Sequence, residues 1–215
     1  SEVDVETDAG RTTNDTPNLV VCTFPRRDLD RLLSFYNVAK HTNRDLVIDI
    51  KQAYILKLFQ TSESWKSIYP SHTDVRIKIY LPRRGWGLID KDLNIWSKKL
   101  LCDDYPGWAE DFVELKNSVD YRYVSSKQKE VIFCCNDFQL QELLDIRPRP
   151  NSSYIRSSTE PFDDEMRLDE VRVKNWLIHF GLIQKETQWN RAHVSGHGSG
   201  DQIRKIIETT ESKEL

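Results

Sequence analysis

Two histidines, two serines and three glycines lie close together near the end of the chain, in the stretch Ala192-His193-Val194-Ser195-Gly196-His197-Gly198-Ser199-Gly200-Asp201. The apolar–polar alternation at its start predicts a short strand, and the glycines predict a turn. Ser199 is followed three residues later by Gln202, which is the form of a capping box, and one helical face then carries Ile203, Ile206 and Ile207. The sequence therefore predicts a strand, a glycine-rich turn and a helix N-terminus.

This arrangement is suited to holding a phosphate. Backbone N–H groups at a helix start have no partner within the helix, and the helix dipole is positive there. Glycine also lets an oxyanion approach the backbone closely. Histidines two residues either side of the Ser-Gly pair add proton-transfer or metal-ligand chemistry. The expected phosphate-binding residues are His193, Ser195, Gly196, Gly198 and Ser199. An ordinary strand-to-helix turn with two polar histidines is the alternative interpretation.

Residues 193–197, His-x-Ser-Gly-His, resemble a signature of the β-CASP branch of the metallo-β-lactamase superfamily, of the ribonuclease J type. The run from Asp137-Phe-Gln-Leu to Glu160-Pro-Phe, with Tyr-Ile-Arg-Ser before it ends, resembles the archaeal ribonuclease J group. The resemblance implies a zinc-dependent ribonuclease that hydrolyses RNA phosphodiesters from a phosphorylated 5′ end. It also implies a catalytic role in the active-site cleft for His197. Ser1-Glu2 resembles the Ser-Glu pair that opens the inserted domain in this family, which implies a catalytic role in the cleft for Glu2 as well.

The zinc core of that family, a His-x-His-x-Asp-His cluster, is missing from this sequence. Of the five histidines only His193 and His197 are clustered, whereas a catalytic zinc site needs three or more protein ligands. No metal ligand set is therefore expected within this chain, and zinc is expected only in the full-length enzyme. The chain resembles the RNA-specificity portion alone, and we expect it to be inactive by itself.

The partners expected from the resemblance are single-stranded RNA with a 5′-phosphate, the missing metallo-β-lactamase domain and a second copy of the chain. A different class of function fits the same residues: a non-catalytic RNA- or phosphate-binding module that lacks the zinc core. A nucleotide binder of the helicase or kinase type is disfavoured, because the sequence has no Gly-x-x-x-x-Gly-Lys-Ser/Thr stretch.

Composition limits these alternatives. The formal net charge of the 215 residues is -3, so any nucleic-acid site must be a local basic patch. No apolar run is long enough to cross a bilayer, which predicts a cytoplasmic protein without a membrane partner. The four cysteines show no Cys-x-x-Cys spacing, and three of them, Cys22, Cys134 and Cys135, lie in apolar runs. Buried, reduced thiols are therefore expected.

The pattern of elements predicts an α/β fold. Apolar runs at 19–24, 46–50 and 131–135 alternate with helical stripes at 29–39 and 53–59, which is typical of a mostly parallel sheet flanked by helices. A further strand is predicted at 75–80, and further helices are predicted at 90–101, at 137–144, from about Pro161 and at 173–180. The helix at 137–144 is predicted from an apolar stripe of Phe138, Leu140 and Leu144. The resemblance makes residues 17–189 a β-CASP domain. Residues 1–16 are then a flexible polar lead-in, and 190–215 return into the absent metallo-β-lactamase sandwich.

Ligands of such sheets bind at the carboxyl ends of the strands. Arg26, Arg27 and Arg31 follow the first strand, and the resemblance implies that they line an RNA channel. Arg156 and Ser157 lie in a hydroxyl-rich turn that can clamp a phosphate. The alternatives are that these arginines are solvated surface residues and that the serines cap a helix.

Aromatic residues are dense in the middle of the chain, where Trp65, Trp86, Trp96 and Trp108 surround Arg83 and Arg84. They are able to stack on unpaired bases. Tryptophans of this kind are more often core or interface anchors, and we favour that interpretation.

Overall fold

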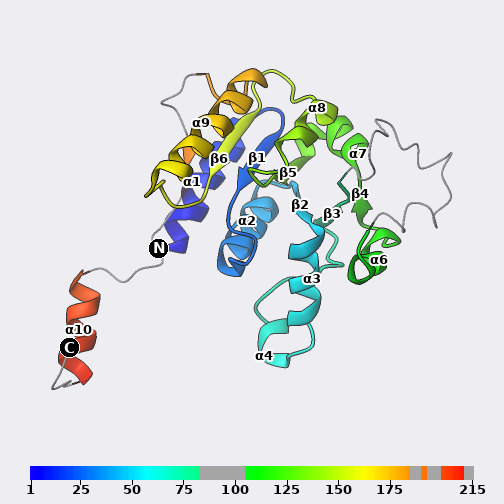
Figure 1. Cartoon of the computed structure of the whole chain (residues 1–215). Helices are drawn as coiled ribbons and strands as arrows, with labels where there is room; N and C mark the ends of the chain where they lie inside the picture. Colours follow the sequence, from blue (N-terminus) through cyan, green and yellow to red (C-terminus); the bar gives the residue numbers. More distant parts are fainter. Residues whose placement is uncertain (83–104, 185–189, 193–199, 211–215) are drawn as a thin grey trace.

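The strands of the chain form one seven-stranded sheet in the order β4-β3-β2-β5-β1-β6-β7, and each pairing between neighbours is parallel (Figure 1). This computed structural model describes residues 1–82, 105–184, 190–192 and 200–210. The strands are β1 (Val20–Thr23), β2 (Asp45–Asp49), β3 (Ile77–Tyr80), β4 (Ser118–Val119), β5 (Val131–Cys134), β6 (Ser153–Arg156) and β7 (Asn190–Arg191).

The helices cover both faces of this sheet. The longer ones are α1 (Glu2–Asp15), α2 (Leu29–His41), α3 (Ile50–Phe59), α6 (Gly107–Val113), α9 (Asp164–His179) and α10 (Gly200–Thr210). The shorter ones are α4 (Glu63–Lys66), α7 (Tyr121–Ser126), α8 (Leu143–Ile146) and the 3₁₀ turns Gln128–Glu130 and Leu140–Glu142. None of the helices within the described ranges combines the length and apolar composition that crossing a membrane requires.

Alternate residues of each strand enter two separate cores. Val20 and Cys22 of β1 pack with buried side chains of α1, α2, α3 and α6, whereas Val21 packs with those of α7, α8 and α9. A parallel sheet covered on both faces needs apolar residues at every strand position, which explains the continuous apolar runs. The predicted α/β class with a mostly parallel sheet is confirmed. Its β-CASP identity and the C-terminal sandwich remain predictions.

The first residues of the chain differ from the prediction. Residues 1–16 are expected to be a flexible lead-in, but residues 2–15 form α1, which packs against α2 and β6. Val5, Ala9 and Thr13 are buried on one face of this helix at a spacing of four residues. Only two of these three residues are apolar, so composition hides the stripe. The threonine satisfies its hydroxyl by donating to the carbonyl of Ala9 at 2.7 Å.

The segment after β5 also differs. The prediction of a helix here with a buried stripe of Phe138, Leu140 and Leu144 is wrong, because Phe138 and Leu144 are exposed. The buried residues are instead Leu140, Leu143 and Ile146, at the three-residue spacing that suits a 3₁₀ turn leading into the short helix α8. The side chain of Asn136 accepts a bond from the amide of Phe138 at 2.7 Å, which favours a turn there.

The other predicted elements agree in type with small shifts. The helix expected near Pro161 begins at Asp164, because Asp163 caps it by accepting from the amide of Met166 at 2.7 Å. The last helix, α10, begins at Gly200, and in Figure 1 it lies away from the sheet. The predicted helix at 90–101 lies outside the described residues. The expected burial of Cys22, Cys134 and Cys135 as free thiols is confirmed.

Candidate functional site

The carboxyl ends of all strands meet at one edge of the sheet, because the described pairings are parallel. Charged and hydroxyl side chains lie at or just after the ends of β1, β2, β5 and β6 at this edge, and they include most of the predicted site residues that the structure describes. Three groups of contacts can be distinguished there. One contains Arg31, another contains Arg156, and the third contains Arg26.

Arg31, in the first turn of α2, is the centre of the first group. Only 2% of its surface is exposed. Its Nε and Nη2 donate to the two carboxylate oxygens of Glu2 at 3.1 and 3.0 Å, and the hydroxyl of Ser34 donates to Glu2 at 2.9 Å. The bond from Arg31 is the main reason that the pKa of Glu2 lies below its ordinary value. Glu2 is therefore ionised near neutral pH, and it acts as an acceptor and counter-charge for a buried guanidinium.

The other side of the same guanidinium joins the ends of β6 and β7. Nη1 of Arg31 donates to the hydroxyl of Ser157, and that hydroxyl donates to the carbonyl oxygen of Ala192. Nη1 also lies 3.3 Å from the same carbonyl oxygen. Ala192 is the residue directly before His193. The Arg31 group therefore anchors the point from which residues 193–199 begin.

Arg156, at the end of β6, belongs to the second group. Its Nη1 lies 3.6 Å from a carboxylate oxygen of Asp137, which follows β5. Arg172 of α9 donates to the backbone carbonyl of Asp137 at 3.1 Å. Burial raises the pKa of Asp137, and the two nearby arginines oppose that rise. Arg172 is also paired with the carboxylate of Asp169 at 3.2 Å, so the two arginines of this group are balanced by two carboxylates.

Two polar groups in this neighbourhood have no hydrogen-bond partner within the described part of the chain. They are the Nη2 of Arg172 and the hydroxyl of Ser158, both buried as atoms. Buried donors without partners are uncommon in folded proteins, so these two donors are candidates for contacts with a polar ligand. Asp137, Ser158 and Arg172 are not among the predicted site residues. Only the hydroxyl-rich turn and its arginine indicated this region.

Arg26 lies on the opposite side of β1 from Arg31. Its Nε is paired with the carboxylate of Asp49 at the end of β2. Asp49 also caps α3 by accepting from the amide of Gln52 at 2.8 Å, so the carboxylate is held in place from two directions. The structure therefore does not bring Arg26 together with Arg31, although both belong to the carboxyl edge.

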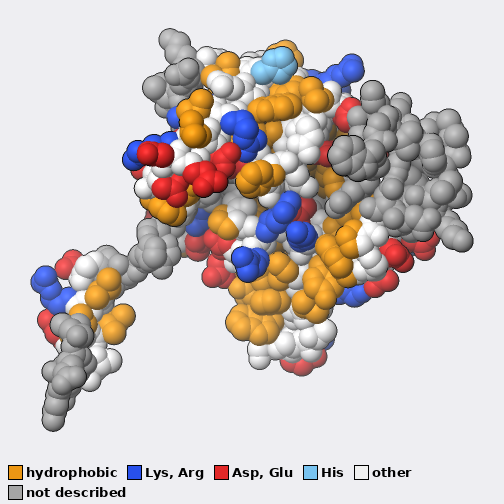
Figure 2. Space-filling view, viewed as in Figure 1, with side chains coloured by type: hydrophobic (Ala, Val, Ile, Leu, Met, Phe, Trp, Pro, Cys, Tyr) orange, Lys and Arg blue, Asp and Glu red, His pale blue; other side chains and the backbone are white. Residues whose placement is uncertain are grey.

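On the molecular surface in Figure 2, positive charge lies in small groups of side chains. On the face drawn in Figure 2, basic side chains gather in a small group near the centre, and acidic side chains form a separate group to the left. Hydrophobic side chains lie between them. The net charge of -3 agrees with this view, since no broad basic field covers the face.

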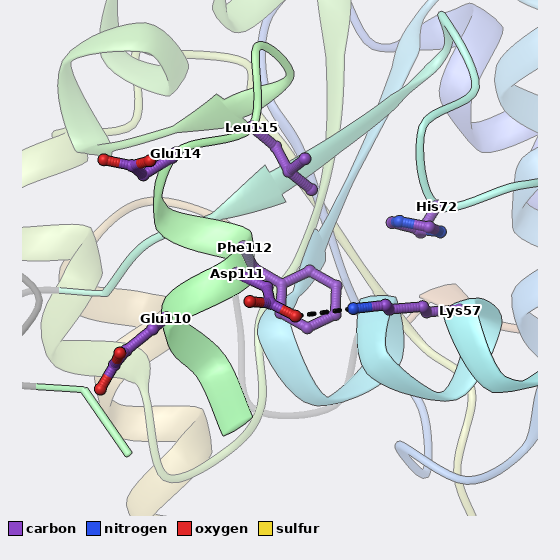
Figure 3. Close-up of a pocket in the computed structure, with 7 residues that line it drawn as sticks. All are labelled: Lys57, His72, Glu110, Asp111, Phe112, Glu114 and Leu115. Carbon is purple, nitrogen blue, oxygen red and sulfur yellow. Dashed lines mark hydrogen bonds and ion pairs between the residues drawn. The ribbon is translucent and has the colours of Figure 1, made fainter. Parts of the chain in front are cut away.

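A further cavity, of about 460 Å³, lies between α3 and α6 (Figure 3). Its lining contains the three carboxylates Glu110, Asp111 and Glu114, with one cation, Lys57, paired to Asp111 at 2.8 Å. Burial and the neighbouring Lys57 lower the pKa of His72 on the facing loop, so His72 is mainly neutral at pH 7. An acidic lining repels phosphate, which excludes this cavity as the site of a polyanion.

Several predicted residues lie outside the described residues: His193, Ser195, Gly196, His197, Gly198 and Ser199. Among the residues that the structure does describe, no three His, Cys, Asp or Glu side chains are grouped so that they could hold a metal ion. The described residues therefore do not supply a zinc site.

A scan against protein-family models gives no match for this chain. A search of curated proteins also gives no significant match.

Proposed function

We propose that this chain is the RNA-binding and specificity portion of a zinc-dependent ribonuclease of the β-CASP type. In this proposal the turn from Ser195 to Ser199 holds a phosphate of single-stranded RNA. The zinc ligands and the hydrolytic step belong to a metallo-β-lactamase domain outside these residues. His197 would serve that domain's active site as a proton carrier.

The observation that carries the proposal is the anchoring of Ala192. Arg31 and Ser157 both bind its carbonyl oxygen, and Glu2 neutralises Arg31 on the other side. A phosphate-binding turn must be presented from a rigid support, because a loosely held turn loses the entropy of ordering when it binds. The three residues thus have a positioning role, and their contacts support the siting of the turn at the carboxyl edge.

Two arginines near the same edge are further candidates for phosphate contacts. Arg156 lies 3.6 Å from the carboxylate of Asp137, and Arg172 of α9 contacts the backbone carbonyl of Asp137 and is paired with Asp169. Contacts of this kind bind the RNA backbone irrespective of base sequence. We therefore expect affinity to fall as salt rises and to depend little on base composition.

The test is binding of single-stranded RNA, with and without a 5′-phosphate, measured by fluorescence anisotropy at two salt concentrations. Gly196→Val should weaken binding more than Ser195→Ala, because a β-branched side chain blocks the approach of the phosphate to the backbone. Gly10→Val on α1 is the control, since a Cβ at Gly10 meets no atom within 4 Å. Equal affinity of the wild type and Gly196→Val would overturn the proposal.

The second candidate function is a binding module with no catalytic partner. The same contacts support it, because binding of an RNA backbone phosphate requires hydrogen-bond donors and positive charge but no zinc chemistry. The distinguishing measurement is cleavage of a 5′-monophosphorylated oligonucleotide by the chain mixed with a metallo-β-lactamase domain of the same enzyme type, with added zinc. Cleavage that His197→Ala abolishes favours the ribonuclease. RNA binding without cleavage favours the module.

A further inference from the structure

A second cleft opens at the carboxyl edge, over β5 and its neighbours β1 and β2. The connection after β1 leads to α2, on the same face of the sheet as α1 and α3, whereas the connection after β5 leads to α8 on the other face. Neighbouring strands whose connections leave toward opposite faces separate at their ends, and ligands of doubly wound sheets bind in the resulting crevice. The topology therefore places a binding crevice here before any side chain is considered.

A cavity of about 280 Å³ lies between side chains at this position. It is lined by Arg26, Asp49, Ile50, Lys51, Pro82, Pro106, Trp108, Ala109 and Gln139. A narrow inner part, which shares Arg26 and Asp49, reaches down to Thr23 and Asn136 at the strand ends. The volume is near the lower limit of small-molecule sites, which begin at about 300 Å³. It suits a ligand of one nucleotide rather than a dinucleotide.

The lining of the cleft contains two cations, Arg26 and Lys51. Arg26 uses Nε to bind Asp49, and within the described residues its terminal nitrogens contact no acceptor. Lys51, in the first turn of α3, is exposed and forms no ion pair with any described residue. Among the described residues of the lining, Asp49 is the only carboxylate, and it is already engaged by Arg26 and by the amide of Gln52. The N-terminus of α3 adds a positive partial charge.

The lining also contains apolar and aromatic residues. Trp108 of α6 is 41% exposed, and its neighbour Tyr54 meets it in an edge contact with the ring centroids 5.4 Å apart. Pro82, Pro106 and Ala109 complete a wall without charges. An exposed indole beside proline rings is a platform for a flat heterocycle, and stacking on it does not depend on which base is bound.

We propose that this cleft binds a nucleoside monophosphate, with its base on Trp108 and its phosphate at Arg26 and Lys51. The ligand is either a free nucleotide or one nucleotide of an RNA strand, since both present the same base and phosphate. The inference does not require the proposed RNA function, because none of its residues lies in the turn from Ser195 to Ser199.

The experiment is a calorimetric titration of the full chain with AMP, adenosine and inorganic phosphate. AMP should bind more tightly than either part alone. Lys51→Ala, at an exposed position without an ion pair, should weaken AMP but leave adenosine unchanged, and Lys51→Arg should restore AMP binding. Lys57→Ala is the matched control, because Lys57 lies on the same helix but faces the acidic cavity of Figure 3.

Trp108→Leu should weaken AMP by about 5-fold to 100-fold, since stacking is worth about 1–3 kcal/mol per base. Trp108→Phe keeps an aromatic face and should recover most of this loss, which separates stacking from a folding defect. Gly196→Val should bind AMP as the wild type does, so failure of the RNA proposal leaves this result unaffected. An oligonucleotide that competes with AMP identifies the RNA source, and one that does not compete identifies the free nucleotide. Equal AMP affinity in the wild type, Lys51→Ala and Trp108→Leu would overturn the inference.

Discussion

Arg31 and Glu2 are 29 positions apart in the chain, yet the guanidinium meets both carboxylate oxygens, at 3.1 and 3.0 Å. The pair attaches the N-terminal helix α1 to the first turn of α2. Because the same arginine reaches Ser157 and the carbonyl of Ala192, one buried cation connects the start of the chain with the ends of β6 and β7. Stability at this edge and the position of Ala192 are therefore coupled.

Glu2→Gln should lower the free energy of unfolding at pH 7 by about 1–2 kcal/mol. Removing one partner of a fully buried pair costs about 3–5 kcal/mol, and this pair is worth less because the Glu2 side chain is 41% exposed and solvent screens it. The remaining cost arises because Arg31 keeps its charge among neutral partners.

This difference should depend on pH. The pKa of Glu2 is lowered in the folded protein, so its contribution is present above the ordinary value of 4.5 and is lost as pH falls through the lowered pKa. Urea unfolding at pH 7, 5.5 and 3 measures the gap between the wild type and Glu2→Gln. Asp8→Asn, an exposed position on the same helix, serves as the control. A gap that stays constant down to pH 3 would contradict the ion-pair explanation.

The cysteines provide a test of the sheet itself. Cys22, Cys134 and Cys135 are buried, and burial raises the pKa of Cys134 and Cys135 well above the ordinary value. A thiol that is both buried and protonated reacts slowly. Titration of the native protein with a thiol reagent at pH 8 should therefore label at most Cys102, and full labelling should require denaturant. Rapid labelling of all four thiols in the native protein would refute the assignment of β1 and β5 to the core.

Much of the sheet could be predicted because its strands are buried on both faces. Runs such as Leu19–Phe24 and Leu46–Ile50 are apolar except for Thr23 and Asp49, and near-continuous apolar strands are typical of a parallel sheet that is covered on both faces. Strand order could not be read in the same way. The placement of β5 between β1 and β2 depends on contacts more than 80 residues apart, for which the local pattern has no signal.

The site was predictable only in part for the same reason. Arg31, Arg156 and Ser157 were indicated by their positions after strands, whereas Asp137 and Arg172 become relevant only when α9 and the end of β5 are brought together. Helix α1 was missed because its buried face contains only Val5, Ala9 and Thr13. So narrow a buried stripe can be identified from the contacts of the folded helix, but not from the hydrophobicity of the sequence.

The segment after β5 offers a direct comparison between the predicted stripe and the observed one. Leu143 is fully buried and Leu144 is 52% exposed, although they are neighbours of the same residue type. Leu143→Ala should lower the free energy of unfolding by about 2–5 kcal/mol, the usual cost of emptying a core position. Leu144→Ala should cost less than about 1 kcal/mol. Chemical denaturation of both variants measures the two losses of unfolding free energy. A larger loss for Leu144→Ala than for Leu143→Ala would favour the predicted helix with Leu144 on its buried stripe.

Substitution of two buried serines at opposite ends of β6 can distinguish an effect on RNA binding from an effect on stability. Ser157 accepts from Arg31 and donates to the carbonyl of Ala192 at the carboxyl edge. Ser152 accepts from the amide of Leu19 at 3.2 Å and donates to the carbonyl of Arg149 at 2.7 Å at the other edge. Either change to alanine leaves buried groups without a hydroxyl partner, so both should cost about 1–3 kcal/mol of stability.

Only Ser157→Ala should also weaken RNA binding, by several-fold at low salt, because it removes one of the two bonds that hold the carbonyl before His193. Ser152→Ala should bind RNA as the wild type does, since its hydroxyl lies at the far end of the strand. Anisotropy measurements at a temperature where both variants are fully folded compare the two directly. If the two serine variants lose RNA affinity equally, the loss reflects stability alone, and the anchoring of Ala192 by Arg31 and Ser157 has no part in binding.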